Sequence, residues 1–191
     1  MALVESYMTP LGTQLPNFSL LNVVNNHMEG LKKLKGGKGT LIIFMCNHCP
    51  YVIHLLDGII KTSIDFSKKG ITTISISSNS IETHPQDGPE EMKKIALLKK
   101  FPFPYLYDKS QEVAKNFQAA CTPDFYLFDN HQKLVYRGRY DESRPGNQIP
   151  VNGKDLHRAS ELMLQKVSQS VVQYPSIGCS IKWYTGNNPQ K

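Results

Sequence analysis

Hydrophobic and polar positions along the chain follow strand spacing in some segments and helical spacing in others. The run over residues 40–45 is almost entirely apolar, which a central strand covered on both faces requires. From residue 50 to residue 64 apolar side chains recur at helical spacing, and cations with a glycine at residues 68–70 predict the end of that helix. The β-branched run at residues 71–77 predicts a second strand.

The rest of the chain continues this alternation. A short hairpin is predicted from residue 17, and prolines at 102 and 104 exclude a helix interior at residues 101–104. The order of elements predicts an α/β fold, a central mixed sheet with helices on both faces and an N-terminal hairpin extension. The further predicted elements are helices at 90–100, 110–117 and 154–167, strands at 105–107, 124–128 and 133–136, and a loop at 79–89.

The 191 residues are expected to form a single domain, with a core at about 15–168 and a C-terminal tail at 169–191. No apolar run approaches the roughly 20 residues of a membrane-spanning helix. Residues 1–12 lack the basic start and apolar run of a signal peptide, so we expect a cytoplasmic protein without membrane contact. The apolar tail residues indicate docking, onto the core or onto a second copy in a homodimer.

The formal charge of +6 raises the question of nucleic-acid binding. The densest basic run, residues 32–38, lies in a glycine-rich turn without interleaved aromatic side chains, and the lysines at 93–100 lie on the polar side of a helix. Neither pattern is that of a nucleic-acid surface, so no such partner is expected. The glycines never form a phosphate-binding loop after a strand, so no organic cofactor is expected.

Cys46 and Cys49 form a C-x-x-C at the end of one predicted strand and the start of a helix. Thiol–disulfide exchange needs a thiolate that attacks and a second thiol that resolves the mixed disulfide, and this spacing supplies both. The helix N-terminus favours a thiolate, and a protonated His48 between the cysteines would add positive charge. The alternatives are an inert buried pair or a metal site, but a metal needs two further ligands. No second C-x-x-C supplies them, so no metal is expected.

A second motif, Cys121–Thr122–Pro123, directly precedes a predicted strand. Proline cannot donate to a sheet ladder, so its position here suggests a specific structural role. A cis Thr122–Pro123 bond would leave the Thr122 backbone groups free to pair with a substrate, and the alternative is a trans proline that opens an edge strand.

Four motifs together resemble the thioredoxin superfamily, in the redoxin branch of the alkyl hydroperoxide reductase/thiol-specific antioxidant proteins. The similarity is closer still to an uncharacterised thioredoxin-like group with a Cys-Asn-His-Cys-Pro motif. The resemblance covers nearly the whole chain and rests on residues 44–52, 121–129, 143–147 and 175–179.

The resemblance implies a thioredoxin fold, with Cys46 as the attacking cysteine, Cys49 as the resolving one and Pro123 as the cis-proline beside them. Cys121 would then lie near the pair, either as a third thiol or as a small buried hydrophobic residue. Cys179 is interpreted as a free thiol or a packing residue of a docked tail. The implied partners are disulfides or thiols of proteins or small molecules.

Departures from the family patterns leave a second activity open. A peroxiredoxin would carry a Thr or Ser where this chain has Cys46, with the peroxidatic cysteine at Cys49. The hydroxyl that would position a peroxide is therefore missing, although the Cys49–Pro50 step is shared with peroxiredoxins. The sequence predicts a thiol–disulfide oxidoreductase, with thiol peroxidase as the alternative.

Overall fold

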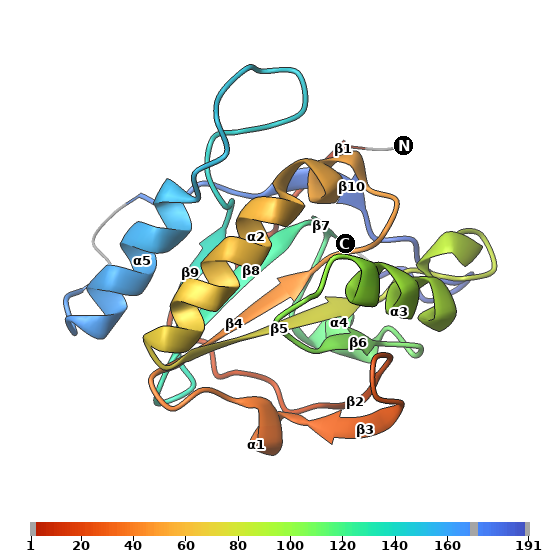
Figure 1. Ribbon diagram of the computed structural model, residues 1–191, viewed down its shortest axis with the longest axis horizontal. Helices are drawn as coiled ribbons and strands as arrows, with labels where there is room; N and C mark the ends of the chain where they lie inside the picture. Colours follow the sequence, from red (N-terminus) through yellow and green to blue (C-terminus); the bar gives the residue numbers. More distant parts are fainter. Residues whose placement is uncertain (1–2, 169–171, 190–191) are drawn as a thin grey trace.

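The structure, a computed structural model that describes residues 3–168 and 172–189, has a main sheet of seven strands (Figure 1). Two neighbour pairs in this sheet, β4 with β5 and β5 with β6, are parallel, and the others are antiparallel. The sheet is therefore mixed, as predicted. In spatial order the strands are β3 (His27–Gly30), β2 (Ser19–Asn22), β6 (Tyr105–Tyr107), β5 (Ile71–Ser77), β4 (Gly39–Phe44), β8 (Asp124–Asp129) and β9 (Leu134–Gly138).

Helices cover both faces of this sheet, which confirms the predicted layers. Successive side chains of β4 point to opposite faces, so Leu41 and Ile43 enter one core while Ile42 and Phe44 enter the other. The first core is closed by α2 (Pro50–Lys68), α3 (Pro89–Leu98) and α5 (Lys154–Leu164), and the second by α1 (Leu31–Leu34) and α4 (Glu112–Asn116).

The predicted elements are present, with small shifts at their ends. The helix predicted at 154–167 ends at Leu164, and the predicted loop at 79–89 contains a short 3-10 turn, η1 (Pro85–Asp87). The N-terminal hairpin is β2–β3, which extends the sheet beyond β6.

A second sheet of three strands was not predicted. Here β10 (Ile177–Ser180) lies between β1 (Leu3–Glu5) and β7 (Cys121–Thr122), antiparallel to both. The tail expected at 169–191 therefore docks onto the core through β10, and residues 169–171 and 190–191 of that tail lie outside the described residues. This small sheet joins both ends of the described chain to the Thr122–Pro123 segment.

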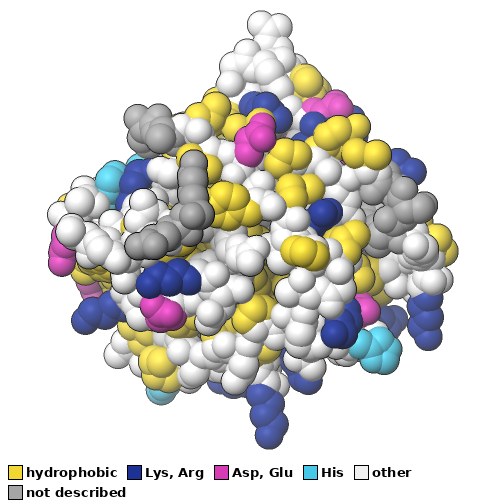
Figure 2. Space-filling view, turned by 180° about the vertical axis from the view of Figure 1, so that it is seen from behind, with side chains coloured by type: hydrophobic (Ala, Val, Ile, Leu, Met, Phe, Trp, Pro, Cys, Tyr) yellow, Lys and Arg dark blue, Asp and Glu magenta, His cyan; other side chains and the backbone are white. Residues whose placement is uncertain are grey.

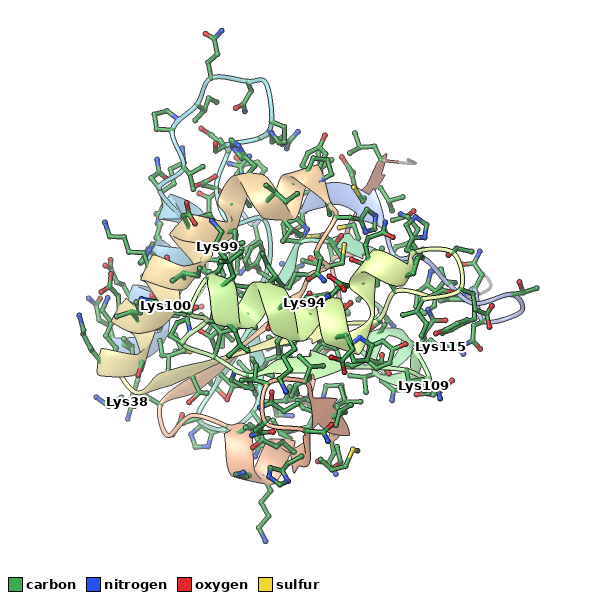
Figure 3. All side chains as sticks on the ribbon, turned by 45° about the vertical axis from the view of Figure 1, so that its right-hand side comes forward. Lys38, Lys94, Lys99, Lys100, Lys109 and Lys115 are labelled. Atoms are coloured by element: carbon green, nitrogen blue, oxygen red, sulfur yellow. The ribbon has the colours of Figure 1, made fainter. Side chains whose placement is uncertain are left out.

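Charged groups are dispersed over the surface. Figure 3 shows labelled lysines spread along one side, with Lys38 toward one end and Lys109 and Lys115 toward the other. Lys94 and Lys115 each form an ion pair with a glutamate three residues earlier on the same helix. From behind, groups of hydrophobic side chains are interspersed with polar and charged ones (Figure 2). No helix within the described ranges has the length and apolar character to cross a membrane.

Candidate thiol site

The cysteine pair lies where the central strand passes into the longest helix. After β4 the chain turns through residues 45–48, and Cys49 is the N-cap residue of α2, with Pro50 at its first helical position. Proline suits that position because its missing N–H would have no partner there in any case. Cys46 is 1% exposed and Cys49 fully buried, so both sulfurs lie beneath the surface.

The ionisations of the neighbouring Cys46 and Cys49 thiols are coupled. The pKa of Cys49 is lowered and that of Cys46 is raised, because the thiol that keeps its proton stabilises the neighbouring thiolate. The carbonyl oxygen of Thr122, 3.1 Å from the Cys49 sulfur, only accepts hydrogen bonds and therefore favours a protonated Cys49. These contacts oppose one another, so the negative charge is assigned to the two cysteines together and not to either one. The pair loses its first proton much more readily than its second.

The Cys46–Cys49 loop is anchored to a buried carboxylate, that of Asp87 in η1. One carboxylate oxygen accepts the backbone N–H of Asn47 at 2.8 Å, and the other lies 2.6 Å from His48 Nδ1. Asn79 Nδ2 donates to the second oxygen at 2.8 Å. Sequence reasoning missed Asp87 and Asn79, because they lie in a loop that carries no recognisable motif.

His48 and Asp87 act in opposite directions on Cys46. His48 Nδ1 lies 3.9 Å from the Cys46 sulfur, so a protonated ring would stabilise a thiolate there. The negative charge of Asp87 is one of the influences that raise the Cys46 pKa, after the hydrogen bond with Cys49 and burial. The structure therefore brings His48 to the cysteines, together with a carboxylate that holds the ring in place.

Thr122 contacts both cysteines of the pair. The peptide bond between Thr122 and Pro123 is cis. The hydroxyl of Thr122 lies 3.5 Å from the Cys46 sulfur, and its carbonyl faces Cys49. Cys121 is also buried nearby, but its sulfur lies 3.9 Å from two carbonyl oxygens, and burial raises its pKa.

Strand β10 covers the backbone of Thr122. Thr122 is directly opposite Cys179 in the ladder, and a Cβ at Gly178 would lie 2.0 Å from the Thr122 carbonyl oxygen. The expectation that the Thr122 backbone is free to pair with a substrate is therefore wrong for this conformation. The chain's own C-terminal strand occupies that edge.

The same strand brings a third sulfur to the site. The sulfur of Cys179 lies 3.0 Å from that of Cys49, although 130 positions separate them in the chain. The sequence leaves Cys179 as either a free thiol or a packing residue, and its proximity to Cys49 follows only from the pairing of β10 with β7.

A surface hollow lies beside the cis-proline. Pro123 lines it together with Tyr51 from α2 and Ile177 from β10. Arg144 from the loop at residues 143–147 also lines this hollow, which places a cation at the same opening. The hollow has a volume of only about 20 Å³, so it admits a substrate toward the Thr122–Pro123 segment only after it widens.

Among the described residues, one group has metal-ligating atoms close together: those of Cys46, His48 and Asp87 lie within 4.8 Å of one another. Structural zinc sites have four protein ligands, and the Asp87 oxygens already accept hydrogen bonds from the loop. His54 is not part of this group, because its Nε2 atom is hydrogen-bonded to the Ser143 hydroxyl at 2.7 Å. The arrangement is better described as a hydrogen-bonded support for Cys46.

Comparison with known proteins identifies the lineage of this site. The AhpC/TSA family matches residues 11–137, a span that includes Cys46, Cys49 and Pro123. This chain belongs to the AhpC/TSA family. Comparison with curated proteins found no match.

Two solved structures resemble this AhpC/TSA-family chain over almost its entire length. An uncharacterized conserved protein from Geobacillus kaustophilus is 48% identical, with a TM-score of 0.94, covering 96% of this chain and 97% of its own. A hypothetical protein from Sinorhizobium meliloti is 36% identical, with a TM-score of 0.92, and the match covers 95% of this chain and 99% of that protein. The thioredoxin domain of a thiol-disulfide oxidoreductase from Bacteroides vulgatus is 21% identical, with a TM-score of 0.62, covering 81% and 98%, and shares the fold.

Proposed function

We propose that this AhpC/TSA-family protein is a thiol–disulfide oxidoreductase that uses Cys46 and Cys49 as its redox pair. The observation that carries this proposal is the placement of both thiols at the N-terminus of α2, where Thr122 contacts the Cys46 sulfur at 3.5 Å and the Cys49 sulfur at 3.1 Å. The short C-x-x-C loop keeps the two sulfurs within reach of a disulfide bond. The substrates are disulfides or thiols of proteins or small molecules, and the chemistry suits a reducing cytoplasm.

The reaction needs no group beyond these side chains. The Cys46 thiolate attacks a substrate disulfide, one substrate sulfur leaves as a thiolate, and Cys46 carries the other as a mixed disulfide. Cys49 then attacks the Cys46 sulfur, which releases the second substrate thiolate and forms the Cys46–Cys49 disulfide. Two electrons pass to the substrate, and the reverse sequence oxidises a dithiol.

Two neighbours of Cys46 favour a thiolate on its sulfur, against the opposing effects of burial and of the Asp87 charge. The Thr122 hydroxyl and a protonated His48 ring both lie close enough to stabilise a charge on its sulfur. Cys49 lies between the Thr122 carbonyl and Cys179, so an external disulfide reaches it less directly. We therefore assign the first attack to Cys46 and the resolving step to Cys49.

The test is a redox titration of the full chain in glutathione or dithiothreitol buffers, with free thiols counted after acid quenching. The proposal expects a reversible two-electron couple that persists in Cys179→Ser and in Cys121→Ser, and that the double variant Cys46→Ser/Cys179→Ser abolishes. A potential near about −270 mV would indicate a reductant, and one near about −120 mV an oxidant. If the disulfide that forms never contains Cys46, the proposal is wrong.

Thiol peroxidase is a second candidate, favoured by membership of the AhpC/TSA family and by the Cys49–Pro50 step at the start of α2. Cys49 would attack a peroxide oxygen to form a sulfenic acid and an alcohol or water, and Cys46 would then displace water to form the disulfide. Peroxide should then oxidise the protein faster than it oxidises free cysteine, in a reaction that Cys49→Ser abolishes. A rate no greater than that of free cysteine would exclude this activity.

A further inference from the structure

Cys49 has a thiol neighbour on each of two different elements. Cys46 precedes it in the loop after β4, and Cys179 approaches from β10. The Cys49 and Cys179 sulfurs are 3.0 Å apart and both residues are buried. A disulfide bond is about 2.05 Å long, so closing this one requires the sulfurs to approach by about 1 Å.

We propose that Cys179 is a third redox-active thiol, which exchanges with the Cys46–Cys49 disulfide and becomes bonded to Cys49. This inference rests on the proposed function, because it needs the Cys46–Cys49 disulfide as its starting point. It assigns a chemical role to the strand that covers Thr122.

The exchange conserves atoms and electrons within the chain. The Cys179 thiolate attacks the Cys49 sulfur, so that the Cys49–Cys179 bond forms as the Cys46–Cys49 bond breaks. Cys46 leaves as a thiolate and takes up the proton that Cys179 lost. The only oxidant is the substrate disulfide that generated the Cys46–Cys49 bond. No net oxidation accompanies the step.

The reduced site suppresses ionisation of Cys179. Burial and the hydrogen bond with Cys49 raise the pKa of Cys179 to about 12, and a negative charge on Cys49 contributes. When Cys49 is in a disulfide it carries neither a proton nor a charge, so the contributions from Cys49 disappear. Lys182, which lowers the Cys179 pKa, remains. Cys179 therefore ionises more easily in the state in which it has a disulfide to attack.

The product differs from the starting disulfide in what it joins. A Cys46–Cys49 bond closes a short loop, whereas a Cys49–Cys179 bond links the start of α2 to β10. Cys46 is then a thiol again beside Thr122 and His48, ready to attack a second substrate disulfide. Cys121 has no such position, because its sulfur contacts carbonyl oxygens.

The experiment maps disulfides in the full chain after equilibration with reduced and oxidised glutathione, acid quenching, alkylation and non-reducing peptide mass spectrometry. In the wild type we expect peptides linked through Cys46–Cys49 and through Cys49–Cys179. In Cys46→Ser we expect Cys49 and Cys179 to lose alkylation together and to appear in one linked peptide. Cys179→Ser should show the Cys46–Cys49 link alone, and Cys121→Ser should show both links.

The outcomes separate this inference from the function on which it rests. A Cys46–Cys49 link in the wild type with no Cys49–Cys179 link in either the wild type or Cys46→Ser overturns the third thiol and leaves the oxidoreductase. If the wild type forms the Cys49–Cys179 link alone and Cys179→Ser forms no Cys46–Cys49 link, the proposed redox pair is wrong, and the exchange that starts from its disulfide is overturned with it. Circular dichroism of each variant checks that it is folded, and the wild-type map decides the matter without any substitution.

Discussion

At the scale of single residues, the thiol site depends on polar groups that have no access to water. Asp87 is fully buried, and its carboxylate satisfies donors from Asn47, His48 and Asn79. A buried carboxylate is tolerated when its oxygens accept this many hydrogen bonds. Its removal would leave each of those donors without an acceptor.

Asp87→Ala is therefore expected to lower the free energy of unfolding by about 2–4 kcal/mol, because unsatisfied buried donors cost about 1–3 kcal/mol each. Urea unfolding of the reduced protein measures this loss. Glu82→Ala, an exposed carboxylate in the same loop, is the matched control and should stay within about 0.5 kcal/mol of the wild type. Equal stability of the two variants would contradict the anchoring role of Asp87.

Asp124 follows the cis-proline and is a buried carboxyl of a different kind. Burial raises its pKa to about 7, although the Tyr126 hydroxyl donates to one of its oxygens at 2.8 Å. The folded protein therefore keeps this proton to about pH 7, whereas the unfolded chain releases it near about pH 4. Between these values the folded state binds more protons than the unfolded one, so stability falls as pH rises.

Asp124 is expected to lower the free energy of unfolding by about 1.4 kcal/mol for each pH unit between pH 4 and 7. Asp124→Asn removes this contribution, so urea unfolding across that range should give a flatter pH dependence than the wild type. Asp57→Asn, at an exposed position, should keep the wild-type slope. Parallel slopes for the wild type and Asp124→Asn would show that Asp124 does not titrate in this way.

At the scale of secondary-structure elements, the main sheet and its helices could be predicted and the small sheet could not. The continuous apolar run of β4 and the helical spacing in α2 are strong local signals, and they place Cys46 and Cys49 correctly at the junction. Strand β10 has four residues, Ile-Gly-Cys-Ser, too few and too polar for a periodicity to appear. Its partner β7 has two residues. Pairing between segments so far apart in the sequence produces no local pattern in either of them.

The close packing of β10 on β7 depends on a glycine. In Gly178→Ala the new methyl group would lie 2.0 Å from the Thr122 carbonyl oxygen, so the strands must separate. We expect a loss of about 1–3 kcal/mol in unfolding free energy, typical of overpacking, and faster amide exchange in β10. Gly37→Ala, where a Cβ meets no atom within 4 Å, is the control. Unchanged exchange in β10 would mean that the packing there is looser than described.

At the scale of the whole molecule, all four cysteines are enclosed, with exposed fractions of 1%, 0%, 0% and 3% for Cys46, Cys49, Cys121 and Cys179. A substrate disulfide therefore meets the pair only after part of the cover moves. The hollow beside Pro123 borders both β10 and the loop at residues 143–147, so displacement of either would widen it.

Iodoacetamide should accordingly alkylate the cysteines of the reduced protein more than about tenfold more slowly than it alkylates glutathione. A local opening that costs about 1.4 kcal/mol of free energy slows the reaction by a factor of about ten. Urea should restore the full rate. Gly178→Ala should accelerate modification of Cys49 while Gly37→Ala leaves it unchanged, which mass spectrometry of alkylated peptides would resolve. Rapid alkylation of the native wild-type protein would mean that the thiols are open without any movement of β10.

The pairing of β10 with β7 also sets an order of events during biosynthesis. Cys49 is translated 130 residues before Cys179, which at about 5–20 residues per second is on the order of 10 s. Throughout that interval the nascent chain has its first two thiols but not the strand that will shield them. The redox centre of this protein is therefore most open to oxidants and to neighbouring chains while it is being made.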